Sequence, residues 1–153
     1  DETVTNVITR NNLFMCVSGM GLDVGTSNIK EQDFDNDGFG GFKKFAKWNG
    51  SKIFSSIKDA LNSKDIYFKK GAFEIPTANC FQTGLQAPKD ENKIYSSQEI
   101  DCRLAPTSGA IDKGQVLFNF NDNFTGKAPD LGAIELGSPL PTYGPRTKTT
   151  PVR

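Results

Sequence analysis

The sequence contains no histidine, one tryptophan and three cysteines, and neither sign of charge is in excess. Without histidine, the Ser-His-Asp and Cys-His sets of nucleophilic enzymes are excluded, and zinc would need an unusual set of ligands. Eighteen basic and eighteen acidic side chains cancel, so no overall field attracts nucleic acid or an anionic membrane. No apolar run approaches the roughly 18 residues of a membrane-spanning helix. We therefore expect neither a nucleic-acid partner nor a membrane span.

The N-terminal region contains two short apolar runs with a high preference for β-structure, both within residues 4–17. The corner Arg10-Asn11-Asn12 separates them. Polar corners between β-branched and aromatic runs favour a turn that joins two strands. The pattern predicts a strand, a turn and a second strand.

A short phrase recurs along the chain. Asn12-Leu13-Phe14 is echoed by Asn79-Cys80-Phe81 and, more loosely, by Asp101-Cys102-Arg103. Cys80 and Cys102 lie 22 positions apart, and a period of about 22 residues suits one coil of a solenoid of stacked parallel strands. We predict that the second and third phrases lie on adjacent, parallel, in-register strands. Coincidence between short strings is the alternative.

The odd number of cysteines leaves two interpretations open, in a chain large and apolar enough to need no disulfide framework. If Cys80 and Cys102 stack in neighbouring coils, their α-carbons would lie about 4.8 Å apart, within the range of a disulfide. Cys16 would then stay single. Alternatively, all three are small buried hydrophobic residues.

Residues 28–65 interrupt the repeat and are predicted to form an insertion outside the stacked strands, where such folds place binding loops. Alternating apolar residues flank Asn49-Gly50, the strongest short signal for a two-residue hairpin turn. Ser55 or Ser56 can then cap a short helix. We expect a hairpin followed by a helix through Ile57, Ala60 and Leu61.

The insertion also contains Asp33, Asp35 and Asp37, followed by Gly38. Alternate carboxylates before a glycine are the spacing of a calcium-binding loop. The twelfth position of such a loop would be Lys44, where a bidentate glutamate is required. Two interpretations stay open: an isolated loop that binds Ca²⁺ weakly, or an acidic turn without metal.

The candidates for catalysis are few and are ordinary surface residues by pattern. A hydrolase needs two carboxylates facing each other across a sugar, and a lyase acting on uronic acids can use a lysine base with calcium. The carboxylate candidates are Asp35 with Asp37 and Asp65 with Glu74, and the candidate bases are Lys43, Lys44 and Lys47.

Two aromatic residues, Trp48 and Tyr143, lie beside predicted turns and are candidates for stacking on a sugar ring. For Trp48, packing in the core is the default alternative. Asn49 and Asn123 match the acceptor pattern for N-glycosylation, which matters only in a eukaryotic secretory pathway.

The last third of the chain carries the most informative phrases, Leu104-Ala-Pro-Thr-Ser-Gly-Ala-Ile-Asp-Lys-Gly and Ala128-Pro-Asp-Leu-Gly-Ala-Ile-Glu. Over roughly residues 100–146, the sequence resembles the closing segment of secreted right-handed parallel β-helix proteins. That group contains polysaccharide lyases, hydrolases and epimerases beside non-catalytic surface proteins. Gly109 stands where the group often has proline and Ile134 where it often has tyrosine, departures that concern packing.

The resemblance implies an all-β fold, the terminal coils and cap of a right-handed parallel β-helix, with an inserted hairpin and short helix. We assign residues 1–27 to one coil, 28–65 to the insertion, 66–137 to the terminal coils and cap, and 138–153 to an extended proline-rich tail. Charged residues of the cap are predicted to form a structural network with no catalytic role. They are Arg103, Asp112, Asp130 and Glu135.

The resemblance also implies an extracellular or cell-surface protein. We expect the C-terminal part of a β-helix protein that binds or processes polysaccharide, in which this segment mainly stabilises and caps the solenoid. Whether the parent is a lyase or glycoside hydrolase stays open. The alternatives are a non-catalytic structural or adhesive component of a fibre or cell surface, and a calcium-dependent carbohydrate-binding module. Because residues 4–8 carry no proline or lysine to protect a strand edge, preceding coils of this protein or another chain are the expected partner.

Overall fold

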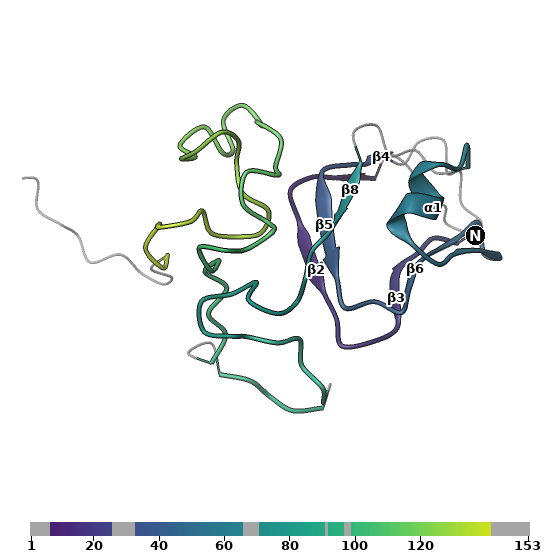
Figure 1. The fold of residues 1–153 in the computed structure, drawn as a ribbon, viewed down its shortest axis with the longest axis horizontal. Coiled ribbons are helices and arrows are strands. Elements are labelled where there is room, and N and C mark those ends of the chain that lie inside the picture. The colour runs from purple at the N-terminus through teal and green to yellow at the C-terminus, as the bar shows by residue number, and fades with distance from the viewer. Residues whose placement is uncertain (1–6, 26–32, 66–70, 91, 97–98, 142–153) are drawn as a thin grey trace, which may run out of the picture.

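The computed structural model describes residues 7–25, 33–65, 71–90, 92–96 and 99–141. A strand-rich part and an irregular part lie side by side (Figure 1). Strands dominate the regular structure of the described residues, their sheets are parallel and mixed, and helix is almost absent, so the prediction of an all-β chain is confirmed. The elements are β1 (Ile8–Thr9), β2 (Leu13–Met15), β3 (Met20–Asp23), β4 (Asp33–Phe34), β5 (Asp37–Gly40), β6 (Lys44–Trp48), β7 (Lys52–Phe54), α1 (Ile57–Leu61) and β8 (Ala72–Glu74).

The strands stack in layers. In the first layer β1, β2 and β3 pair in parallel with β4, β5 and β6 of the second. The second layer follows the first after 25 residues at Ile8–Asp33 and 24 residues at Met20–Lys44. β8 adds a third layer on β5, in parallel. Residues 33–48 therefore belong to the stack, and the prediction of an insertion outside it is wrong for them.

One corner repeats through all three layers. Asn11, Asn36 and Gly71 precede β2, β5 and β8, and their φ angles are 59°, 52° and 115°. Asparagine and glycine tolerate this left-handed conformation best. The Asn11 N–H donates to the Asn36 carbonyl at 3.0 Å, and the Asn36 N–H donates to the Gly71 carbonyl at 2.9 Å. The predicted corner is confirmed. In the next layer Asn36 repeats Asn11, and the phrase that follows Asn12 is repeated in β5 and not at Asn79.

The inner face of the stack is aromatic. Phe14 lies opposite Phe39 in the register, and their rings stack with centroids 5.2 Å apart. Phe45 meets Phe39 edge-on at 5.0 Å. Burying one such side chain contributes roughly 1.5–3 kcal/mol, so this cluster is the main core of the strand-rich part. Its buried members are Val24, Phe34, Phe39, Phe45, Ala46, Trp48, Phe54, Ala60 and Ala72.

The outer face of β2, β5 and β8 carries a second core. Successive residues of a strand point to opposite faces, so Leu13, Gly38 and Phe73, which share one register, face outward. A β-carbon on Gly38 would lie 2.9 Å from Leu131 and 2.8 Å from Ile75. The glycine therefore lets the segment of residues 76–141, here called the C-terminal segment, close onto the sheet. The buried residues of this core are Ile75, Cys80, Leu104, Ala110 and Leu131.

The predicted hairpin and helix are present. β6 and β7 are antiparallel, with Trp48 opposite Lys52. Three residues separate this pair, one more than predicted, and Asn49 and Gly50 have positive φ angles. α1 begins after Ser56, whose side chain accepts a hydrogen bond from the Asp59 N–H. The helix cap is therefore confirmed at Ser56.

The described part of the C-terminal segment contains no strand, and its one isolated bridge joins Phe81 and Leu104 in antiparallel sense. The Ala105 N–H donates to the Cys80 carbonyl at 3.0 Å. The prediction that the Cys80 and Cys102 segments are parallel is wrong, because the chain between them reverses direction. All three cysteines are free. Beyond β8, the expected terminal coils are thus replaced by turns.

The tail and the helix content complete the description. Pro139 to Pro141 have no regular structure, as the prolines predict, and residues 142–153 lie outside the described residues. Among the residues that the structure describes, no helix is long and apolar enough to cross a membrane.

Candidate functional site

The aspartates predicted to bind calcium lie at the corner between β4 and β5. Asp37 is 1% exposed. Its carboxylate accepts hydrogen bonds from the Thr9 hydroxyl at 2.6 Å and from the Asn12 N–H at 2.8 Å. Both donors belong to the first layer, so Asp37 ties the second layer to the first.

Asp35 and Asp33 bind other partners. Asp35, also 1% exposed, accepts a hydrogen bond from the Gly71 N–H of the third layer at 2.7 Å. Asp33 forms an ion pair with Arg10 at 2.8 Å. In the described part of the chain, no group of three His, Cys, Asp or Glu side chains is arranged to hold a metal ion. The structure thus gives all three carboxylates structural partners, and calcium binding stays a prediction.

The other predicted catalytic groups lie on the surface. Asp65 binds Lys52 and, at 2.8 Å, the Ser63 hydroxyl, and the hydrogen bond from Lys52 is the main cause that lowers the pKa of Asp65. Lys47 lies 3.6 Å from Asp23. Lys43 and Lys44 are exposed. These contacts are those of ordinary surface charges.

Trp48 is 1% exposed and meets Phe34 edge-on, with ring centroids 6.0 Å apart. A ring without an exposed face cannot stack on a sugar, so the prediction of a carbohydrate-binding Trp48 is wrong. Successive side chains of β6 point to opposite faces, and Trp48 points into the core although the hairpin turn follows it directly. Tyr143, the second aromatic candidate, lies outside the described residues.

The predicted network of the cap exists for its three acids. Asp130 is 5% exposed, and its carboxylate accepts from the N–H groups of Asp112 at 2.8 Å and Leu136 at 2.7 Å. Asp112 accepts from the Lys127 N–H at 2.7 Å, which holds the pKa of Asp112 below its usual value. Glu135 accepts from the Asp130 N–H at 2.9 Å, and burial raises the pKa of Glu135.

Arg103 does not join these acids. Its guanidinium binds both carboxylate oxygens of Asp101, at 2.6 Å and 3.0 Å. The bidentate pairing that the sequence suggested is therefore local, within two residues. The network of the cap consists of carboxylates and backbone N–H groups.

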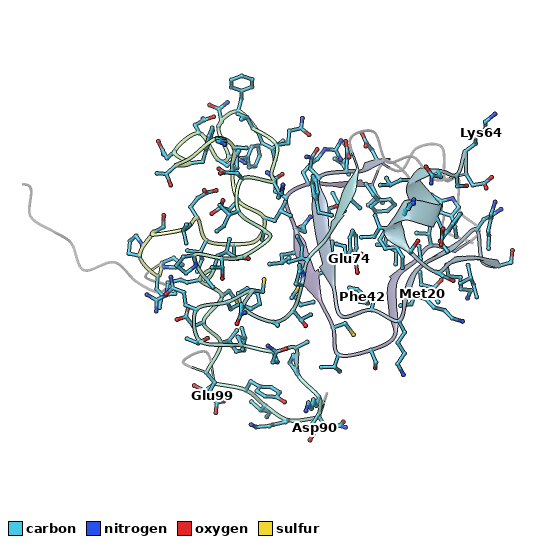
Figure 2. All side chains as sticks on the ribbon, in the orientation of Figure 1. Met20, Phe42, Lys64, Glu74, Asp90 and Glu99 are labelled. Atoms are coloured by element: carbon cyan, nitrogen blue, oxygen red, sulfur yellow. The ribbon has the colours of Figure 1, made fainter. Side chains whose placement is uncertain are left out.

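A groove of about 400 Å³ opens between the outer face of β2 and the loop of residues 81–102. Figure 2 shows Asp90 and Glu99 on this loop, at the bottom of the view. The volume lies within the roughly 300–1,000 Å³ typical of ligand pockets, and such pockets combine apolar walls with a few polar groups. The lining residues are Leu13, Met15, Phe81, Leu85, Gln86, Ala87, Pro88, Lys93, Tyr95, Glu99, Ile100 and Cys102.

The polar groups of the groove lie on the loop. The Lys93 ammonium lies 4.5 Å from the centre of the Tyr95 ring. Glu99 accepts a hydrogen bond from the Ser96 N–H at 2.9 Å. Burial raises the pKa of the Cys102 thiol, so that side chain lines the groove as a neutral group. No local signal in the sequence connected this loop with β2.

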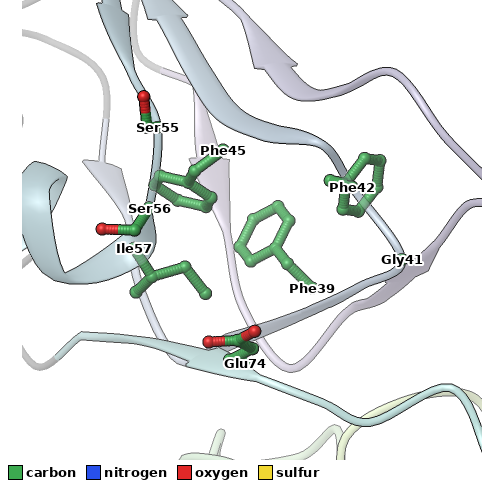
Figure 3. A pocket seen from close by; sticks show the side chains of 8 residues that line it. All are labelled: Phe39, Gly41, Phe42, Phe45, Ser55, Ser56, Ile57 and Glu74. Carbon is green, nitrogen blue, oxygen red and sulfur yellow. The ribbon is translucent and has the colours of Figure 1, made fainter.

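A smaller pocket of about 90 Å³, here called the stack-end pocket, lies above the inner aromatic rings (Figure 3). Its lining comes from β5, β6 and β8, from the turn after β5, and from the segment that leads into α1. Glu74 of β8 takes the position in register with Phe14 and Phe39. The pocket is lined by Phe39, Gly41, Phe42, Phe45, Ser55, Ser56, Ile57 and Glu74.

No protein-family model, curated protein or solved structure matches this chain. Its function must therefore follow from the stack, the C-terminal segment and the two hollows described above.

Proposed function

We propose that this chain is the terminal part of a right-handed parallel β-helix. Two successive coils of three strands, with one strand of a third coil, support this assignment. Parallel pairing of every strand in the second coil with its equivalent in the first is the arrangement of a solenoid. Crossovers between parallel strands are right-handed in nearly all proteins.

In this proposal the C-terminal segment caps and stabilises the β-helix from its side. The hydrogen bonds between this segment and Asn11 are the main support for that role. The Asn11 amide donates to the Gln115 carbonyl at 2.8 Å and accepts from the Gln115 N–H at 2.7 Å. The Gly132 N–H donates to the Asn11 carbonyl at 2.8 Å. One corner residue of the first layer is thus bound to two distant parts of the C-terminal segment. Together with the outer core, these contacts cover the apolar outer face of the coils.

The parent protein is extracellular or at the cell surface and binds or processes polysaccharide. Besides the resemblance of its closing phrases, the groove supports this assignment. Tyr95 and Phe81 offer apolar surface to the C–H face of a pyranose ring. Lys93, Gln86 and Glu99 offer donors and acceptors for its hydroxyl groups. Preceding coils, from the same protein or another chain, are the expected neighbours of the first layer.

Within this segment a non-catalytic role is favoured by the position of the acidic residues. Asp35 and Asp37 are each 1% exposed and accept hydrogen bonds from neighbouring layers. Buried carboxylates that are hydrogen-bonded to neighbouring coils hold the coils together and do not reach a bound sugar. Any lyase or hydrolase activity of the parent would then depend on residues of preceding coils.

Affinity electrophoresis in gels that contain neutral or uronic-acid polysaccharides tests the carbohydrate assignment. We expect at least one polysaccharide to retard the wild-type chain, and Tyr95→Ala to reduce that retardation at least threefold. Phe118→Ala is the matched control, because Phe118 is 83% exposed and lies outside the groove. Equal migration of the wild type in all gels, or equal retardation of the two variants, would contradict the proposal.

A further inference from the structure

The stack-end pocket owes its shape to an interruption of the inner aromatic stack. Phe14 and Phe39 occupy the same inward register position in the first two layers, and Glu74 occupies it in the third. An aromatic side chain there would continue the stack over Phe39. Glutamate leaves a space of about 90 Å³ above the ring. This volume equals about three water molecules, too little for a pyranose ring with its hydroxyl groups.

The chemistry of the lining is one carboxylate on an apolar floor. Among the residues that the structure describes, the Glu74 carboxylate has no hydrogen-bond or ion-pair partner. The Ser56 hydroxyl is engaged as the helix cap, where it accepts from the Asp59 N–H at 3.1 Å. In Figure 3 the hydroxyl groups of Ser55 and Ser56 point away from the space beside Glu74. The carboxylate is thus the charged group that faces the hollow.

The aromatic rings of the floor meet at steep angles. Phe39 and Phe42 have centroids 6.2 Å apart and an interplanar angle of 62°. Figure 3 shows the Glu74 carboxylate next to the Phe39 ring, with Ile57 on the other side of the hollow. A cation within about 6 Å of an aromatic centroid is attracted by the ring, and a carboxylate at the rim adds charge pairing. Anions are repelled by Glu74, and neutral polar ligands find few donors.

We propose that the stack-end pocket seats one face of a small alkylated ammonium group, with Glu74 pairing the charge and the partly buried Phe42 and Ile57 contacting the methyl groups. The site is separate from the groove and goes beyond the proposed polysaccharide function. Methylated ammonium suits the lining better than a bare ammonium, because its methyl groups cover the apolar floor while the charge stays near the carboxylate.

Nuclear magnetic resonance titration of the whole chain with tetramethylammonium chloride tests the proposal. We expect saturable shifts of the amide signals of residues 39–42 and 74, with a Kd in the millimolar range. tert-Butanol, a neutral molecule of similar size, should bind at least tenfold more weakly, and sodium chloride at equal ionic strength should give no saturable shift. Absence of saturation with tetramethylammonium, or equal binding of tert-butanol, would overturn the proposal.

Glu74→Gln removes the charge and keeps the size, and it should weaken tetramethylammonium binding at least tenfold. Glu99→Gln is the matched control, because this carboxylate lines the groove, and its affinity should equal that of the wild type. Glu74 is exposed, so we expect the variant to fold. Unchanged affinity of Glu74→Gln would overturn the assigned role of the carboxylate. The comparison of tetramethylammonium with tert-butanol tests charge-dependent binding on the wild type and does not need the variant to fold.

Discussion

The stacked strands and the C-terminal segment satisfy their backbone groups in different ways. In the strands, the N–H groups donate to carbonyl groups of a neighbouring layer, as the Gly38 N–H of the second layer does to the Asn12 carbonyl of the first at 2.8 Å. In the C-terminal segment, scattered backbone bonds are joined by side chains that act as acceptors: Asp112 accepts from the Lys127 N–H, and Asn121 accepts from the Leu117 N–H at 2.7 Å. Buried backbone groups need hydrogen-bond partners. In the C-terminal segment, aspartate and asparagine side chains supply some of the partners that strand pairing supplies in the stack.

The two parts also bury different side chains. The inner core of the stack contains several buried aromatic rings. In the outer core below the C-terminal segment the buried residues are aliphatic and small, and Phe73 and Phe81 are only partly buried against them. The outer core depends on Gly38, which leaves room for Leu131. We therefore expect the strands to be the more stable unit and the C-terminal segment to open first.

Phe39→Ala should have the largest effect, because it removes a ring at the centre of the inner core that is 3% exposed. The expected loss is about 3–5 kcal/mol in the free energy of unfolding. Urea unfolding followed by the fluorescence of Trp48, the one tryptophan of the chain, measures it. Phe118→Ala should change the value by less than about 0.5 kcal/mol. A loss below about 1 kcal/mol for Phe39→Ala would show that the aromatic stack is not the main core.

Leu131→Ala should destabilise the C-terminal segment by about 2–5 kcal/mol, since Leu131 is fully buried on the outer face of the sheet. Hydrogen exchange distinguishes the two parts. Protection should fall at the Leu131 N–H, which donates to the Ala110 carbonyl at 3.0 Å, and should persist at the Gly38 N–H. An equal loss at both amides would show that the two parts unfold as one unit.

Local chemistry made part of this fold predictable. The corner at Asn11, the turn at Asn49-Gly50 and the cap at Ser56 each depend on a few neighbouring residues, and the structure has all three. The sequence analysis placed residues 33–48 in an insertion and not in the second layer. Their three aspartates, which join this layer to its neighbours, have the spacing of a calcium-binding loop. Their actual donors, among them Thr9 and Gly71, lie far away in the sequence.

The remaining differences arise from contacts that no local pattern records. Trp48 follows the alternation of β6 into the core, whereas its place beside a turn suggested exposure. Cys80 and Cys102 lie in segments that run in opposite directions because the loop between them folds back. The groove forms where that loop meets β2. A repeat of short phrases therefore indicated a solenoid but gave the wrong pair of strands.

Calcium binding to Asp33, Asp35 and Asp37 would strengthen the stack relative to the C-terminal segment. Each carboxylate already has a protein partner, so we expect only weak binding. At a calcium concentration ten times its Kd, the stabilisation would be about 1.4 kcal/mol. Calorimetry should detect heat at millimolar calcium that Asp35→Ala abolishes. Without such heat, these aspartates serve only to join the layers.

The smallest expected effect is a pH dependence within the C-terminal segment. The backbone N–H groups of Lys127 and Ala128 lower the pKa of Asp112 from 3.8. A carboxyl whose pKa is lower in the folded state contributes stability above 3.8, and this contribution is lost as the pH falls through the folded value. Burial raises the pKa of Glu135 from 4.5, so its contribution is present below 4.5 and is lost as the pH rises through the folded value.

Asp112→Asn keeps the acceptor oxygen and removes the charge, so its deficit in stability should be largest near neutral pH and shrink on acidification. Glu135→Gln should show the opposite slope, because the neutral form is the one that the folded state favours there. Urea unfolding midpoints from about pH 2.5 to 7, with hydrogen exchange at the Lys127 and Asp130 amides, measure both. The same slope for the two variants would contradict the assignment of opposite shifts. It would also contradict the view that Asp112 orders this part of the C-terminal segment by binding backbone N–H groups in its charged form.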